Sequence, residues 1–216
     1  LKYFHCDEIL RSLIYDHAGK WQNNNTGILR LVSTINPQIY KGLEIVLQTA
    51  EILKKNTLLN FEWSIIGINK DDRIVKIVEK NKQFCFKNYP IFFKGAMQAE
   101  DLIGELLNSN LFIHPSHIDN SPNSVCEAML LGMPVIAGYV GGIPSLITHE
   151  SDGLLYNSYD PFDLAGMIFM SSNKQNDMEK IGRKAAVIAG KRHDRTTIFN
   201  TIKKTYTDIL SEKEFE

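Results

Sequence analysis

The sequence has no surplus of charge of either sign. Its 216 residues include 24 lysines and arginines and 25 acidic residues, so the formal net charge is −1. Proteins that bind the phosphate backbone of nucleic acids usually carry a clustered basic excess. We therefore expect no nucleic acid among the partners of this protein.

Cysteine is scarce and shows no pairing pattern. Cys6, Cys85 and Cys126 are odd in number and widely spaced, and no Cys-x-x-Cys motif is present. Such a set is typical of free thiols in a reducing compartment and gives no zinc site. The histidines are scattered too, with no spacing that places two of them on one helical face as metal ligands. We expect neither a metal nor an organic cofactor.

Long apolar runs are absent as well. No run approaches the ~20 residues that a membrane-spanning helix needs, and no signal peptide opens the chain. We expect a cytoplasmic location, and two options stay open for the full-length protein: free in the cytoplasm, or peripherally associated with the inner face of the cell membrane. The first residue is Leu1 rather than methionine, which favours a piece of a longer protein.

The sequence does contain a regular alternation of short apolar runs with segments of helical periodicity. We expect strands at 27–33, 61–67, 91–93, 111–114, 135–137 and 154–156, and helices at 42–55, 71–80, 100–107, 124–131, 161–170, 178–189 and 195–210. This alternation predicts an α/β fold with a doubly wound parallel sheet and helices on both faces.

The domain organisation follows from the same pattern. Residues 1–25, with helical apolar spacing at Ile9, Leu13 and Ile14, are interpreted as the tail of an interdomain linker. Residues 26–216 are interpreted as one domain that includes the C-terminal helices. Its last residues, 211–216, form a charged tail that we expect to fray.

The pattern of residues 111–147 predicts a strand, a loop and a helix that together suit a ligand-binding site. Its first strand should end at His114, because Pro115 lacks the amide that a central ladder needs next. A polar loop follows, and Ser124 with Glu127 fits a capping box that begins a helix. In open parallel sheets, anionic ligands bind where such a loop joins a strand end to a helix N-terminus.

Several motifs occur in a fixed order in this stretch. They are Asp119, seven residues, then Glu127-Ala128-Met129, followed by Gly132-Met133-Pro134-Val135 and Gly141-Gly142. Together they resemble retaining glycosyltransferase family 4. The resemblance implies the GT-B fold, of which this chain is the Rossmann-like C-terminal half. It also implies a hexosyltransferase of polysaccharide biosynthesis that transfers sugar from a UDP- or GDP-linked donor with retention of configuration.

The resemblance further implies that a second, N-terminal domain is missing from this chain. The acceptor, a saccharide or a lipid-linked molecule, would bind through that missing domain. We therefore expect this chain to bind the nucleotide-sugar donor and to be inactive alone.

Catalytic roles are implied for Lys41, Asp119 and Glu127. Glu127 matches the acid that binds the donor ribose; the alternative is that it only completes the capping box with Ser124. Lys41, which precedes Gly42, matches the lysine that neutralises the diphosphate leaving group. The alternative for Lys41 is a solvated lysine at the start of a helix.

Asp119 matches the first acid of the family, which lies against the donor sugar, and Asn120 is expected beside it. The family usually has glutamate at this position. The alternative for Asp119 is an Asx turn with Asn120 and Ser121. Ser121-Pro122 replaces the Phe-Gly of the family, and proline removes one amide from the phosphate-binding loop.

The remaining donor contacts are implied at other strand ends. They are the amides of Asn123 and Ser124, then Thr34, Gly67, the backbone of 95–98 against the nucleobase, and Gly141-Gly142. Thr34 stands where the family has an arginine. The glycine pair either permits a close turn near the donor or is a merely flexible turn.

Three further side chains, those of His114, His117 and Cys126, lie close in sequence to the site loop. His114 and His117 flank the site loop, where they either touch substrate or serve a structural role. Cys126 is expected to be a packed small residue and not a nucleophile.

Two further hypotheses stay open beside transfer. The departures at Thr34, Asp119 and Pro122 motivate a non-catalytic nucleotide-sugar sensing or interaction module. A GT-B epimerase of nucleotide sugars is the other, and the order of Asp119 and Glu127 favours it less than transfer.

Overall fold

The computed structural model describes residues 7–24, 26–82 and 85–213. Predictions that concern Cys6 and residues 214–216 lie outside this part of the chain. Within it, no helix has the length and apolar content that a membrane span requires.

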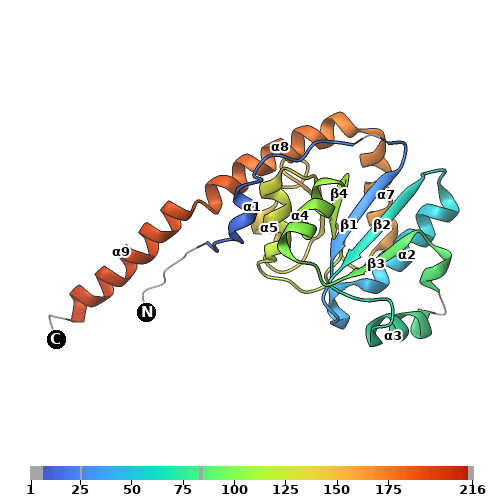
Figure 1. Cartoon of the computed structure of the whole chain (residues 1–216), viewed down its shortest axis with the longest axis horizontal. Helices are drawn as coiled ribbons and strands as arrows, with labels where there is room; N and C mark the ends of the chain where they lie inside the picture. The colour runs from blue at the N-terminus through green and yellow to red at the C-terminus, as the bar shows by residue number, and fades with distance from the viewer. Residues whose placement is uncertain (1–6, 25, 83–84, 214–216) are drawn as a thin grey trace.

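The centre of the molecule is a sheet of six parallel strands (Figure 1). The strands are β1 (Leu29–Thr34), β2 (Phe61–Ile66), β3 (Ile91–Gly95), β4 (Leu111–His114), β5 (Val135–Gly138) and β6 (Leu154–Tyr156). Their spatial order is β3-β2-β1-β4-β5-β6, with β1 paired to β2 from Leu29 opposite Phe61 to Thr34 opposite Ile66. Strands β2 and β3 extend the sheet on one side of β1, and β4, β5 and β6 extend it on the other side, which is the pattern of a doubly wound sheet. The predicted fold class is confirmed.

Helices cover both faces of the sheet. They are α1 (Ser12–Tyr15), α2 (Leu43–Asn56), α3 (Arg73–Lys82), α4 (Ala99–Leu107), α5 (Asn123–Leu131), α6 (Ile143–Leu146), α7 (Pro161–Asn173), α8 (Gln175–Arg192) and α9 (Arg195–Lys213), with two short 3-10 turns, η1 (Ile39–Lys41) and η2 (Phe86–Asn88). One buried cluster joins α2, α3 and α7 to the sheet, and another joins α1, α4, α5 and α8 to its other face. The last helix, α9, extends away from the body of the domain (Figure 1) and continues to Lys213, into the segment that was expected to fray.

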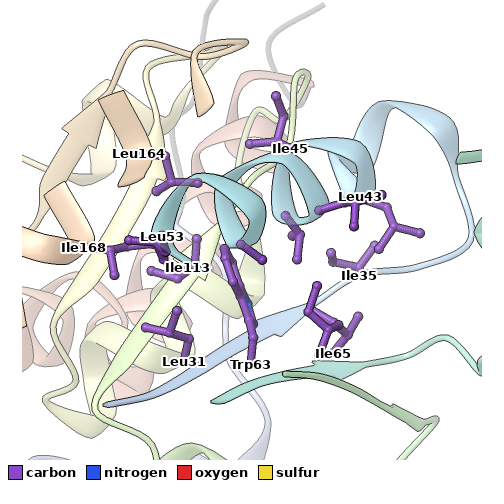
Figure 2. Packing of buried hydrophobic residues seen from close by; sticks show 14 of the residues in the cluster. Leu31, Ile35, Leu43, Ile45, Leu53, Trp63, Ile65, Ile113, Leu164 and Ile168 are labelled. Carbon is purple, nitrogen blue, oxygen red and sulfur yellow. The ribbon is translucent and has the colours of Figure 1, made fainter. Parts of the chain in front are cut away.

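The core beneath α2 shows how the sequence builds one of these layers (Figure 2). Leu43 and Leu53 of α2 pack over Leu31 of β1 and Trp63 of β2, and all four side chains are at most 1% exposed. The indole of Trp63 donates to Ser33 Oγ at 3.0 Å, and Ser33 donates to the carbonyl of Ile113 at 2.7 Å. Burial therefore leaves neither polar group of this pair without a partner.

The segment before β1 packs on the domain although little of it is helical. Among the described residues of this segment, only Ser12–Tyr15 forms a helix, and Ile9 of the predicted apolar spacing is 50% exposed. Leu10 and Ile14 are buried against α5, and the amide of Trp21 donates to the carbonyl of Leu131 at 3.0 Å. These contacts hold residues 10–21 along α5.

The capping box predicted for the central helix is wrong. Helix α5 begins at Asn123 with Pro122 as its N-cap, and no side chain caps it. The carbonyl of Pro122 instead accepts the amide of Val125 at 3.0 Å. Proline holds its own φ near the value that this turn needs, here −72°, so the helix begins one residue before Ser124. The strand end predicted at His114 is confirmed.

Candidate functional site

A cavity of about 380 Å³ opens at the carboxyl edge of the sheet, beside β1 and β4. The ends of β1 and β2, the segment after β3, the loop after β4 and the start of α5 all contribute to its lining. This is the topological switch point, where doubly wound sheets hold their ligands. Seven of the predicted site residues line it: Thr34, Lys41, Gly67, Asp119, Pro122, Asn123 and Ser124.

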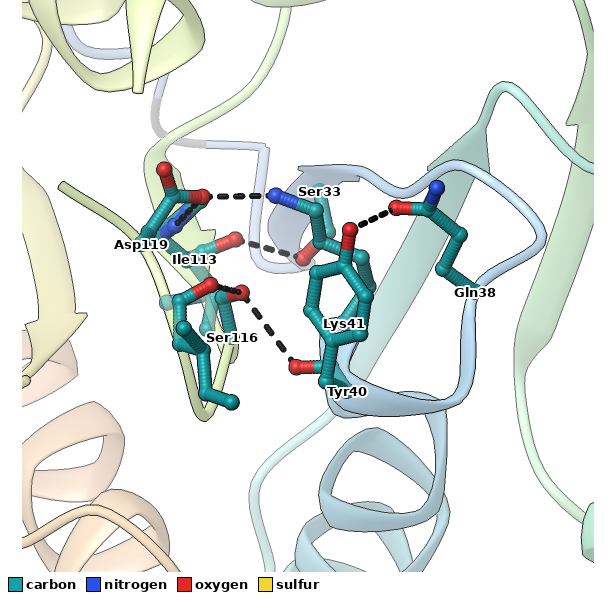
Figure 3. Close-up of polar contacts among 9 residues, drawn as sticks. Ser33, Gln38, Tyr40, Lys41, Ile113, Ser116 and Asp119 are labelled. Carbon is teal, nitrogen blue, oxygen red and sulfur yellow. Dashed lines mark hydrogen bonds and ion pairs between the residues drawn. The ribbon is translucent and has the colours of Figure 1, made fainter. Parts of the chain in front are cut away.

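Lys41, Asp119 and His114 form the charged centre of this cavity. Lys41 Nζ lies 2.7 Å from Asp119 Oδ2, and His114 Nε2 lies 3.2 Å from the same oxygen (Figure 3). Burial raises the pKa of the Asp119 carboxyl, but the hydrogen bonds from His114 and Lys41 outweigh that effect, and the pKa falls below its usual value. Asp119 is therefore an anion at neutral pH.

This geometry decides between the alternatives for two residues. Lys41 is 19% exposed and paired, so it is not a freely solvated lysine. The Asp119 carboxylate bonds to Lys41 and His114 and forms no Asx turn with Asn120 or Ser121 within the described chain. Oδ1 of Asp119 accepts no hydrogen bond from the described residues, and it is available to a ligand hydroxyl.

Lys41 is positioned by contacts between the loops that follow β1 and β4. The hydroxyl of Ser116 donates to the carbonyl of Tyr40 at 3.3 Å (Figure 3), and the amide of His117 donates to the same carbonyl at 2.8 Å. Gly42 has φ +75° and packs so closely that a Cβ there would lie 2.0 Å from the carbonyl oxygen of Pro115. Only glycine satisfies both conditions, which explains the Lys-Gly pair.

The N-terminus of α5 supplies backbone donors to the same cavity. Asn123 and Ser124 occupy its first turn and line the cavity. Within the described residues, neither of their amides donates to a protein acceptor. Free amides and the positive end of the helix dipole favour an anion at this point.

Glu127 is not where the sequence suggested. It is 2% exposed and does not line the cavity. Both of its oxygens accept hydrogen bonds from Arg11, Nε to Oε1 and Nη2 to Oε2, each at 2.7 Å. Arg11 itself lines the cavity, with its side chain 49% exposed. Glu127 therefore neither completes a capping box nor faces the cavity directly.

Arg11 is the site residue that sequence reasoning missed. It belongs to the segment interpreted as linker, and it lies 116 positions before Glu127. A lone arginine between Leu10 and Ser12 has no local pattern that marks a site. Only the docking of this segment on α5 brings the two side chains together.

Gly141 and Gly142 support the site without lining it. The amide of Gly142 donates to the carbonyl of Asp119 at 3.1 Å. A Cβ at Gly141 would lie 2.0 Å from that same oxygen, and one at Gly142 would lie 2.0 Å from the carbonyl oxygen of Asn120. The glycine pair is thus a close turn that holds the Asp119 loop. Asn120 and Ser121 of that loop are exposed and do not line the cavity.

The other candidate side chains take structural positions. His117 bonds to Glu44 and stacks on the ring of Tyr159, with centroids 4.1 Å apart. Burial raises the pKa of the Cys126 thiol to about 11, so the thiol is protonated at neutral pH and packs as a small apolar group; that prediction is confirmed. Among the described residues, no group of three or more histidines, cysteines and acids could hold a metal ion.

Comparison with known proteins places these features in a wider group. The family model described as glycosyl transferases group 1 matches residues 20–201. The amylovoran biosynthesis glycosyltransferase AmsK of Erwinia amylovora is 28% identical over 158 residues, which cover 69% of this chain and 37% of the relative. The chain therefore spans well under half the length of this curated relative.

Two solved structures share the fold. HepE of Anabaena, in complex with UDP and glucose, superposes with a TM-score of 0.71 at 22% identity, over 84% of this chain and 48% of that one. Sucrose-phosphate synthase of Thermosynechococcus elongatus superposes with a TM-score of 0.73 at 18% identity, over 85% of this chain and 46% of that one. The fold is that of a Rossmann-like half of a GT-B glycosyltransferase.

Proposed function

We propose that this chain, which belongs to the glycosyl transferases group 1 family, is the donor-binding domain of a retaining, family 4 glycosyltransferase that uses a UDP- or GDP-linked hexose. One observation carries the proposal. A cation, an acid and free amides of a helix N-terminus converge on one cavity at the switch point of the sheet. A nucleotide diphosphate sugar combines the negative charge and the hydroxyl groups that such a set of groups binds.

The relatives support this choice of ligand. UDP and glucose are the molecules named in the HepE complex, whose fold this chain shares. The name of AmsK refers to the biosynthesis of a polysaccharide, and we propose a role of that kind for the full-length protein. Because the chain spans 37% of AmsK, we assign the saccharide or lipid-linked acceptor to a further domain and expect no turnover by this chain alone.

A cytoplasmic location is part of the same proposal. Cys85 and Cys126 are both free thiols in the structure, which suits a reducing compartment. Peripheral association with the inner membrane face is an option only for the full-length protein.

The chemistry proposed for the cavity is electrostatic. Lys41 and the amides of Asn123 and Ser124 stabilise the charge that develops on the diphosphate leaving group. Such preorganised charge is usually the largest single contribution to catalysis. Oδ1 of Asp119 accepts a hydroxyl of the hexose, and Glu127 accepts the ribose hydroxyls once Arg11 releases it. No side chain is assigned as a nucleophile.

Calorimetric titration of this chain with UDP and with GDP tests the proposal. We expect one of them to bind, and Lys41→Ala to weaken its binding by about tenfold or more, because a charge-assisted hydrogen bond is lost. Lys94→Ala is the matched control: Lys94 is also paired with an acid, Glu105, but it lies outside this cavity. Failure of both nucleotides to bind, or equal losses in the two variants, would refute the assignment.

The full-length protein tests the reaction itself. We expect donor-dependent transfer of sugar to an acceptor, with the anomeric configuration of the donor kept in the product when it is followed by NMR. Inverted product would exclude the retaining assignment. Donor binding without transfer or hydrolysis would instead identify a non-catalytic module.

A further inference from the structure

Arg11 and Glu127 are in contact but differ in their access to the cavity. The side chain of Arg11 is 49% exposed and lines the cavity, whereas the side chain of Glu127 is 3% exposed and does not. Two parallel bonds of 2.7 Å fix the pair. In this arrangement Glu127 does not line the cavity, and both of its oxygens are bonded to Arg11.

The backbone around Arg11 is anchored, whereas its side chain is half exposed. Leu10 and Ile14 on either side are 4% and 1% exposed. The hydroxyl of Tyr15 accepts the amide of Leu10 at 3.2 Å and donates to the carbonyl of His193 at 2.8 Å. Arg11 itself is the N-cap of α1, and among the described residues its side chain bonds only to Glu127. A change of rotamer can therefore move the guanidinium across the cavity without unfolding the segment.

The charges of the cavity show what that movement would achieve. Arg11 and Lys41 are the two lysine or arginine side chains in its lining, and Lys41 is already paired with Asp119. Thr34, at the end of β1, adds no charge. A diphosphate carries at least two negative charges, so Lys41 alone leaves it incompletely neutralised. Arg11 is the second cation within the same cavity.

We propose that Arg11 is a donor-responsive cation: it holds Glu127 in this structure and moves to the diphosphate of a bound nucleotide sugar, which frees Glu127 for the ribose. This inference rests on the proposed donor-binding function. The exchange leaves no buried charge without a partner, because the two ribose hydroxyls replace the two guanidinium bonds on the carboxylate. The guanidinium in turn gains a phosphate, with which it forms bidentate bonds.

Paired ligands with and without phosphate test the exchange. We expect Arg11→Gln to weaken binding of UDP or GDP by about tenfold or more, since a charge-assisted contact is lost, and to leave binding of the matching nucleoside equal or tighter, because Glu127 no longer has to be released from Arg11. Arg30→Gln is the control, because Arg30 is also paired with an acid, Glu62, and lies outside this cavity. Equal losses for nucleoside and diphosphate would show a merely structural role, and unchanged diphosphate binding would overturn the proposal.

A second measurement uses the unmodified protein and does not depend on the folding of a variant. The Nε–H signal of Arg11, assigned through its absence from Arg11→Lys, should shift on titration with UDP or GDP, whereas that of Arg30 should not. A bound nucleotide that leaves the Arg11 signal in place would refute the exchange while the donor-binding function stands. A protein that binds neither nucleotide would refute both.

Discussion

Two ion pairs at the cavity are built in opposite ways. In the pair of Lys41 and Asp119, both side chains line the cavity and are similarly exposed, 19% and 13%. In the pair of Arg11 and Glu127, the cation is 49% exposed and the acid 3%. The first pair presents both charges to a ligand, and the second presents only the cation. The comparison teaches that an acid within a recognisable motif can be buried beneath its cationic partner and so not face the cavity itself.

The two ion pairs should differ most in how far the loss of the cation lowers the free energy of unfolding. Arg11→Ala leaves a buried carboxylate without its partner, which should lower the free energy of unfolding by about 3 kcal/mol. Lys41→Ala leaves Asp119 with His114 and with solvent, so we expect a loss of about 1 kcal/mol. Urea denaturation of both variants measures the two values.

A double variant serves as the control for that difference. Arg11→Met with Glu127→Leu removes both charges together and should recover most of the stability lost in Arg11→Ala, because no unpaired charge is buried. If Lys41→Ala lowered the free energy of unfolding as much as Arg11→Ala does, the two ion pairs would not differ in the way the geometry indicates.

The turn at Gly141 and Gly142, which supports the Asp119 loop, can be disrupted without changing a residue of either ion pair. Gly142→Ala places a Cβ 2.0 Å from the carbonyl oxygen of Asn120, and relief of this overlap should cost about 2 kcal/mol and displace the Asp119 loop. Nucleotide affinity should therefore fall in parallel with stability. Gly104→Ala, in α4 with open space around it, should instead raise stability by up to about 1 kcal/mol. Crystal structures and urea denaturation of the two variants would show whether the close turn has this supporting role.

The smallest predicted effect concerns the pH dependence of stability that comes from the pair of Lys41 and Asp119. The pKa of Asp119 is lowered in the folded state, so the pair contributes stability above the unfolded pKa of that carboxyl. The contribution is lost as the pH falls through the lowered, folded-state pKa. We expect the difference in stability between the wild type and Asp119→Asn to be largest at neutral pH, about 1 kcal/mol, and to vanish in strong acid.

NMR titration of the side-chain carboxyl carbons checks the cause of this shift. Replacement of His114 by leucine should raise the pKa of Asp119 toward its usual value, since one hydrogen bond to the anion is lost. Asp194, whose pKa is lowered by Thr197, should titrate as before. An unchanged Asp119 titration in His114→Leu would assign the shift to Lys41 alone.

The features predictable from the sequence are those with local causes. The strand Leu154–Tyr156 and the start of α7 at Pro161 lie where we expected them, because apolar runs and proline act within a few residues. The first strand begins at Leu29 and not at 27, since Gly27 adopts φ +78°, outside extended geometry. The family resemblance placed Lys41 and Asp119 in one site, and the fold brings them together because each follows a parallel strand and parallel strands end at the same edge.

The features that escaped prediction depend on distant contacts. Ser124 and Glu127 have capping-box spacing, but the docking of residues 10–21 on α5 brings Arg11 to Glu127, and Pro122 caps the helix instead. Gly141 and Gly142 suggested a turn, yet their close packing on the Asp119 loop becomes visible only in three dimensions. Spacing within a motif therefore indicated the loop and the helix start that line the cavity, but not the partners of each acid.

The central claim is that a nucleotide diphosphate binds at the carboxyl edge of β1 and β4. Titration of the 15N-labelled chain with UDP and GDP, followed through its backbone amides, tests this claim most directly. We predict that the largest shifts fall on Asn123 and Ser124, whose amides open α5, and on Thr34 and Gly67 across the cavity. Shifts clustered instead beside α7 and α8, or no shifts with either nucleotide, would contradict the account.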